Sequence, residues 1–348
     1  MKKMLFLLVG LSMASNLLWA QKKAPVALSP AAIATIRPYE DSLKMLFADL
    51  SEKSIRDTLG RIYHRKPEDN LARYEISQQI ARMLIKALKT ENSFYYPFDS
   101  IKNYISIVEP SDQSFKIFSW PIINITGTFE NANETYEYYG AMQINAPELK
   151  LVGLKDKSVS MASPQMQSCA PDNWYGCLYY GSTIKEFDGK KYYFLFGWDG
   201  NTTRSNRKIA EVVTFEGDKP TFGAPVFNVY DDVANAFKIQ HRFFLEYRKS
   251  AAVNLRYEPE QDLIIYDHLS NDDEKEQGFT QKHAEMMPDG MYYGFRYENG
   301  VWKEVGQVLR EYMQSAPVVK PVLGEGRNAS KAQKSGVKKT KKAKKKNN

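Results

Sequence analysis

The stretch LYYGSTIKEFDGKKYYFLFGWDGN, residues 178–201, decides the fold class of this chain. Two short runs rich in aromatic and β-branched residues, Leu178–Ile184 and Tyr192–Trp198, flank the dipeptide Asp188-Gly189. Such runs favour strands, and Asp-Gly tolerates the positive φ angles that a two-residue hairpin turn demands. The stretch therefore predicts an antiparallel β-hairpin.

Similar runs recur along the chain and extend this hairpin into a large antiparallel meander. Asn299-Gly300 gives a second strong hairpin signal, because it separates two further aromatic runs. Two more candidate turns are Asp199-Gly200 and Asp289-Gly290. The other predicted strands are Phe115–Trp120, Tyr136–Ile144, Ile209–Phe215, Phe243–Tyr247, Val253–Tyr257, Leu263–Tyr266 and Tyr293–Tyr297. This pattern predicts a β domain over residues 93–316, and it leaves a sandwich, a barrel and an incomplete propeller open.

A helical hairpin is predicted ahead of the strands, over residues 38–92, which makes the fold class α+β. The first helix is indicated by apolar residues at three- and four-residue steps, namely Leu43, Leu46, Phe47, Leu50, Ile55, Leu59 and Ile62. The second is expected to start at Pro67, which suits the first helical position, and its stripe is Ile76, Ile80, Met83, Leu84, Ala87 and Leu88. The proline-containing residues 21–37 are expected to be an extended linker.

The first twenty residues have the three parts of a signal peptide. Lys2 and Lys3 precede an apolar run, and Leu18-Trp19-Ala20 precedes a polar segment. The run is short and polar for a membrane anchor, so we expect residues 1–20 to be cleaved and no transmembrane span to remain. The sequence thus predicts a periplasmic or secreted protein. No cysteine lies near the cut, which argues against a lipid anchor there.

The C-terminal residues 317–348 form a Lys-rich tail. From Lys320 to Asn348 there are eleven basic residues and one acidic residue, a net charge of +10, whereas the whole chain carries only +7. With so little apolar surface the tail is expected to be disordered. It can attach to an anionic surface or simply keep the protein soluble. The lysines concerned are Lys338, Lys339, Lys341, Lys342, Lys344, Lys345 and Lys346.

Motifs for familiar catalytic chemistry are absent from the sequence. There is no G-x-S-x-G elbow, H-E-x-x-H helix, phosphate-binding loop or EF-hand. No catalytic residue, metal site or cofactor is therefore predicted. The acidic run at residues 271–276 lacks the alternation and the glycine that calcium loops use, so a solvated loop is the favoured interpretation.

Aromatic residues next to polar turns are the best candidates for ligand binding. Trp174 follows Asp172-Asn173, and Trp198 precedes Asp199 and Asn201. A flat ring can cover the apolar face of a sugar while neighbouring polar groups bond its hydroxyls. The alternative is that these rings pack in the core or across strands, which is the commoner role of paired aromatics on strands.

Histidine offers one weaker candidate, His268, which closes a predicted strand after Asp267. An adjacent carboxylate could polarise an imidazole as a general base. Neighbours on a strand point to opposite faces, however, so the two side chains are not expected to meet. A turn or capping role is favoured.

Two cysteines, Cys169 and Cys177, enclose a short loop. In an oxidising compartment, cysteines this close in sequence favour a disulfide, and this is the prediction. The alternative is two separate thiols, because Cys177 enters an apolar strand where cysteine serves as a small core residue.

Several stretches of the β region resemble an uncharacterised family of exported proteins of Gram-negative bacteria. They are Asn173-Trp174-Tyr175-Gly176, residues 195–201 (LFGWDGN), residues 222–227 (FGAPVF), residues 255–257 (LRY), residues 266–270 (YDHLS) and Pro288-Asp289-Gly290. The resemblance covers roughly residues 98–305. It implies export and carries no activity or catalytic residue.

Three functions remain in view. The first is an exported non-catalytic protein that binds an envelope component or glycan. The second is a hydrolase of envelope polysaccharide or peptidoglycan, which would need two convergent carboxyl groups. The third is a structural subunit of an envelope assembly, which would expose a large apolar patch.

Overall fold

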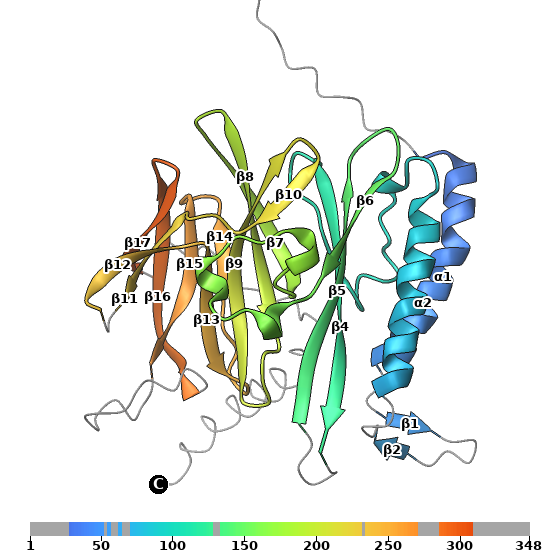
Figure 1. The fold of residues 1–348 in the computed structure, drawn as a ribbon, viewed down its shortest axis with the longest axis horizontal. Helices are drawn as coiled ribbons and strands as arrows, with labels where there is room; N and C mark the ends of the chain where they lie inside the picture. The colour runs from blue at the N-terminus through green and yellow to red at the C-terminus, as the bar shows by residue number, and fades with distance from the viewer. Residues whose placement is uncertain are drawn as a thin grey trace, which may run out of the picture.

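A computed structural model describes residues 28–51, 54–56, 62–64, 70–127, 133–231, 234–270 and 285–308. The predicted signal peptide, the acidic run at residues 271–276 and the Lys-rich tail lie outside these residues. Two helices pack as a pair and are followed by mostly antiparallel sheets (Figure 1). The predicted α+β class is confirmed.

The first helix begins earlier and ends earlier than the sequence pattern predicts. Helix α1 (Pro30–Ser51) starts inside the segment expected to be a linker. Its start is set by Ser29, whose Oγ accepts the Ala32 N–H at 3.1 Å, and by Pro30 at the first helical position. The linker prediction is therefore wrong from Pro30 onward.

Beyond α1, the predicted helical stripe breaks into a small hairpin. Strands β1 (Ser54–Arg56) and β2 (Ile62–His64) pair antiparallel, so Ile55 and Ile62 are not on a helix. Leu59 and Pro67 lie outside the described residues. Helix α2 (Asn70–Leu88) is docked by Asn70, whose side chain bonds both the N–H and the C=O of Ile125.

A four-stranded sheet lies beneath the helices. Its order is β3 (Ser106–Val108), β4 (Phe115–Thr126), β5 (Asn133–Ile144) and β6 (Lys150–Lys155), with all neighbours antiparallel. Phe47 of α1 and Trp120 of β4 pack edge to face, and Ser77 of α2 accepts the Trp120 Nε1–H at 2.8 Å. One face of this sheet thus forms a core with the helices.

A central sheet comes next in the stack. It contains β7 (Leu178–Phe187), β8 (Lys190–Asp199), β9 (Ser205–Glu216) and β10 (Lys219–Phe222), with β13 (Arg242–Arg248) pairing to another part of β9. Tyr193 and Leu195 face the four-stranded sheet, whereas Phe194 and Phe196 face the other way. Burial on both faces explains why β8 is almost continuously apolar.

An outer six-stranded sheet closes the stack. Its order is β12 (Ala236–Gln240), β11 (Phe227–Asp231), β17 (Val301–Val308), β16 (Met287–Glu298), β15 (Leu263–Ser270) and β14 (Leu255–Glu258). The β11–β17 pair is parallel and the others are antiparallel. The helices and three sheets therefore form successive layers (Figure 1). Of the predicted architectures the sandwich is the nearest, with a third sheet added to its two.

The predicted turns have mixed outcomes. Asp188-Gly189 and Asn299-Gly300 form two-residue turns with positive φ at both positions, as predicted. Asp199-Gly200 lies at the end of β8, before a loop that leads to β9. Asp289-Gly290 is not a turn but part of β16, opposite an irregular register in β15.

Short 3-10 segments complete the described structure at Ser93–Tyr95, Ser158–Ser160, Pro164–Met166 and Pro171–Asn173. Neither α1 nor α2, the two long helices of the described ranges, is apolar enough to cross a bilayer.

Candidate functional site

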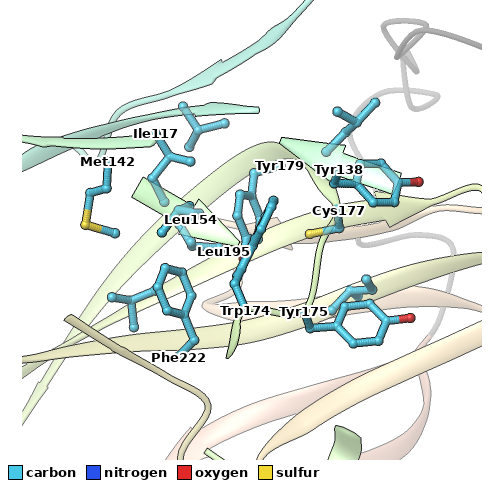
Figure 2. Packing of buried hydrophobic residues seen from close by; sticks show 14 of the residues in the cluster. Ile117, Tyr138, Met142, Leu154, Trp174, Tyr175, Cys177, Tyr179, Leu195 and Phe222 are labelled. Atoms are coloured by element: carbon cyan, nitrogen blue, oxygen red, sulfur yellow. The ribbon is translucent and has the colours of Figure 1, made fainter. Parts of the chain in front are cut away.

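The two predicted stacking tryptophans are core residues. Trp174 is fully buried, and its Nε1–H donates to the Tyr179 hydroxyl at 2.8 Å. Trp198 is 2% exposed and packs edge to face on Tyr136. Figure 2 shows Trp174 among Tyr175 and Tyr179, in the core between the four-stranded and central sheets. Neither indole offers a face to a sugar, so the predicted platform is wrong.

Asp156 explains why the Trp174 segment turns inward. Its carboxylate accepts the N–H groups of Tyr138 and Gly176, at 2.9 and 3.1 Å. A Cβ on Gly176 would lie 2.3 Å from the carboxyl carbon of Asp156, so only glycine permits this approach. The polar residues before Trp174 therefore mark a loop that is tied into the protein.

Asp199 and Asn201 belong to a closed hydrogen-bond network at the end of β8. Asp199 is 5% exposed and accepts the hydroxyls of Tyr138 and Tyr175, at 3.0 and 2.8 Å. The Asn201 N–H donates to the same carboxylate at 2.8 Å. Burial raises the pKa of Asp199, and the hydrogen bond from Asn201 and the others oppose this shift.

Glu246 closes the same network from β13. Arg207 donates from Nε to Glu246 at 2.9 Å and from Nη1 to the Tyr175 hydroxyl at 3.1 Å. Asn201 Nδ2 donates to Glu246 at 3.0 Å. The chain of bonds thus runs from Asp199 through Tyr175, Arg207 and Glu246 back to Asn201. Both carboxylates are occupied by donors from the protein itself.

His268 is paired with Asp289 rather than with its neighbour. Its Nδ1 lies 2.6 Å from Asp289 Oδ2, and its ring packs on Tyr293 with centroids 4.3 Å apart. Asp267 instead accepts the backbone and side-chain N–H groups of Asn254, at 2.6 and 3.0 Å. The prediction that Asp267 and His268 do not meet is confirmed. His268 therefore contacts two residues of β16, Asp289 and Tyr293.

The predicted disulfide is not formed, because both cysteines are buried free thiols. Cys169 forms an antiparallel bridge with Phe222 and accepts a contact from Arg242 Nη2 at 2.7 Å. Cys177 instead packs against Gly197, where a Cβ would lie 2.7 Å from its Sγ. Burial raises the pKa of Cys169 to about 11, so its thiol is protonated and unreactive.

Thiol labelling tests this correction. In native protein we expect neither cysteine to react within minutes with a chromogenic disulfide reagent, because both are buried. After unfolding in denaturant without reductant, both should react. Absorbance of the released thiolate gives the count directly, and a count of zero in denaturant without reductant would restore the disulfide.

An open cleft of about 370 Å³ lies where the central sheet meets the four-stranded sheet. Its residues come from the ends of strands and from tight turns: Ser114, Ile144, Gly189, Lys190, Lys191, Tyr193, Phe215, Gly217 and Asp218. The volume lies within the range of small-molecule sites. Sequence reasoning missed this cleft, because its residues come from turns and strand ends far apart along the chain.

The floor of the cleft is aromatic. Tyr193 and Phe215 meet edge to face at 5.7 Å, and buried Phe115 supports both, at 5.1 and 5.5 Å. Phe215 is partly exposed, whereas Tyr193 is 6% exposed. The floor therefore offers an apolar surface held by a rigid ring cluster.

The rim of the cleft carries two lysine–carboxylate pairs. Lys191 donates to Asp112 at 3.0 Å, and the Tyr193 hydroxyl donates to the same carboxylate at 3.1 Å. Lys150 pairs with Asp218. Burial raises the pKa of Asp112, but the bonds from Lys191 and Ser114 outweigh it and hold the pKa below its usual value. Lys190 also lines the cleft and makes no ion pair with a described residue, so the rim combines two lysine–carboxylate pairs with one further positive charge.

Comparison with protein-family models, with curated proteins and with solved structures found no match to this chain.

Proposed function

We propose that this protein is an exported, non-catalytic protein of the bacterial envelope, periplasmic or secreted, that binds a glycan in the cleft around Phe215. The cleft carries this proposal, because it joins an aromatic floor to a polar rim. An apolar ring surface suits a pyranose face, and the polar rim suits its hydroxyls. Export rests on the signal-peptide pattern and on the resemblance to exported proteins.

A hydrolase is less well supported. Asp199 and Glu246 are the carboxylates of the network around Asn201, and both accept several hydrogen bonds from the protein. Glycoside hydrolysis requires an acid and a second carboxylate that face the scissile bond across a cleft. Neither of these two lines the cleft that we assign to the ligand. The carboxylates at the cleft itself, Asp112 and Asp218, are each ion-paired with a lysine.

One observation favours the third function, a structural subunit. Four exposed apolar side chains lie on the β11–β12 hairpin and on β17, namely Tyr230, Phe237, Ile239 and Val305. Tyr230 and Phe237 contact each other at 5.2 Å. Purification of the protein from detergent-extracted envelopes separates the two functions: a stoichiometric partner protein favours the subunit, and retained polysaccharide favours the glycan binder.

Substitution of the cleft floor tests the glycan proposal. We expect wild-type protein to bind the neutral probe chitotetraose, and Phe215→Ala to weaken binding about tenfold, because the variant loses the partly exposed ring of the floor. Isothermal titration calorimetry measures both. Phe237→Ala is the matched control, since it removes an exposed phenylalanine from the outer sheet. Equal affinity in wild type and Phe215→Ala would contradict the site. The same titration with polygalacturonate shows whether the cleft prefers an acidic sugar.

A further inference from the structure

Lys185 of β7 lies inside a cage of aromatic rings. Its Nζ is 5.2 Å from the ring centroid of Tyr257, 5.4 Å from Trp302 and 5.6 Å from Tyr297. The Lys185 side chain is 14% exposed and pairs with Asp262. A desolvated ammonium within 6 Å of a ring face is attracted by the ring quadrupole. Three such rings and a carboxylate therefore hold one cation.

The walls of the cage come from a different sheet than the cation does. Tyr257, Tyr297 and Trp302 belong to β14, β16 and β17 of the outer sheet, whereas β7 belongs to the central sheet. The Tyr257 hydroxyl also donates to Asp262 at 2.8 Å, which fixes the carboxylate beside the cation. The cage therefore joins the two sheets at the end of the β7–β8 hairpin.

Two polar groups of the cage rings make no hydrogen bond with a described residue. The Nε1–H of Trp302 and the hydroxyl of Tyr297 are buried and have no hydrogen-bond partner among the described residues. Buried polar groups normally have hydrogen-bond partners. Because these two groups have none among the described residues, hydrogen bonds do not position the two rings. Both rings instead contact Lys185, and they pack on each other with centroids 5.1 Å apart.

Phe187 makes a second contact between the end of the β7–β8 hairpin and the outer sheet. It packs on Gly300 in the β16–β17 turn, where a Cβ would lie 2.6 Å from the Phe187 ring. Gly300 has a φ of 82°, so both the close approach and the backbone require glycine. Lys185 and Phe187 lie two residues apart and thus hold the same face of the strand against the outer sheet.

The opposite face of this hairpin forms a wall of the cleft. Lys185 pairs with Tyr192, so the adjacent residues Lys191 and Tyr193 point the other way. Both line the cleft, and both bond Asp112, which precedes β4 of the four-stranded sheet. A shift of the hairpin on its Lys185 face would therefore move the cleft wall on the other.

We propose that Lys185 is a positioning residue for the cleft: its aromatic cage fixes the β7–β8 hairpin to the outer sheet and so sets the position of the wall formed by Lys191 and Tyr193. That this wall contacts a glycan rests on the function proposed above. We call the contacts of Lys185 with Tyr257, Tyr297, Trp302 and Asp262 the Lys185 latch. These contacts do not involve the ligand.

Lys185→Met tests the latch, because methionine keeps most of the chain length and removes the cation. We expect amide hydrogen exchange over residues 188–191 to become about tenfold faster, since the loss of a buried cation–π cage lowers the cost of local opening. Affinity for chitotetraose should fall about fivefold. Lys185→Arg should restore both values to within about twofold, because a guanidinium also binds ring faces.

Lys238→Met is the matched control, since it removes an ion-paired lysine from β12 without touching the hairpin. Exchange over residues 188–191 that stays within about twofold of wild type in Lys185→Met would overturn the latch. So would faster exchange spread evenly over the chain, since this would show general destabilisation. If wild-type protein binds no chitotetraose, the proposed function fails, and the exchange result alone still decides the role of Lys185.

Discussion

Arg242→Met is expected to lower the free energy of unfolding by about 3 to 5 kcal/mol. Arg242 and Glu211 form an ion pair in which both side chains are 0% exposed. Removing the guanidinium leaves the Glu211 carboxylate buried without its cation, which is the costly way to break such a pair. Burial disfavours the charge on Arg242, but attraction to Glu211 keeps its pKa above the ordinary value.

Arg242 also fastens the long loop between β6 and β7. Its Nη1 donates to the carbonyls of Pro164 and Gln167, at 2.6 and 2.7 Å, and its Nη2 donates to Phe222 O at 3.2 Å. On the other side, Glu211 accepts the Tyr179 hydroxyl. The Arg242 side chain therefore connects the loop to the central sheet. Its loss should remove both the contacts with the loop and the ion pair with Glu211.

Urea unfolding followed by tryptophan fluorescence measures this effect. Arg248→Met is the control, because it removes an exposed arginine from the same strand and should change stability by about 0.5 kcal/mol or less. The double variant Arg242→Met with Glu211→Met should recover part of the loss, since it removes both charges. A loss below about 1 kcal/mol in the single variant would show that the ion pair does not stabilise the fold.

Features that depend on neighbouring residues were predictable from the sequence. Asp188-Gly189 predicted its hairpin because a two-residue turn is decided by the φ angles of those two residues. Leu43 and Phe47 predicted a buried helix face for the same local reason. The end of α1 at Ser51 was missed, because apolar spacing continues through Ile55 into a hairpin that the pattern cannot distinguish from a helix.

The candidate site was not predictable, since it depends on contacts between distant segments. Lys185 meets Asp262 and Trp302 only once two sheets have packed. Trp174 was misjudged because the polar residues before it suggested an exposed turn, whereas Asp156 draws that loop into the core. Tertiary packing decided which aromatic residues line the floor of the cleft and which lie in the core. The local sequence pattern does not encode this packing.

Neutralising the tail should abolish binding to anionic membranes at low salt. A lysine near an anionic surface contributes about 1 kcal/mol. The seven lysines between Lys338 and Lys346 would thus supply up to about 7 kcal/mol, or about five orders of magnitude in partitioning. Deletion of residues 320–348 should remove this binding, as measured by sedimentation with phosphatidylglycerol vesicles in about 10 mM salt, where the screening length is about 30 Å.

Two variants of full length separate charge from chain length. Replacing the seven lysines with glutamine should abolish sedimentation as the deletion does, whereas replacing them with arginine should preserve it, because a guanidinium keeps the charge. Binding should also disappear near 1 M salt, where the screening length falls to about 3 Å. If the glutamine variant and the deletion both still sediment at low salt, the tail is not the attachment, and its lysines serve solubility. Retention would then have to come from the β domain, whose exposed apolar hairpin at Phe237 and Ile239 would be insensitive to salt.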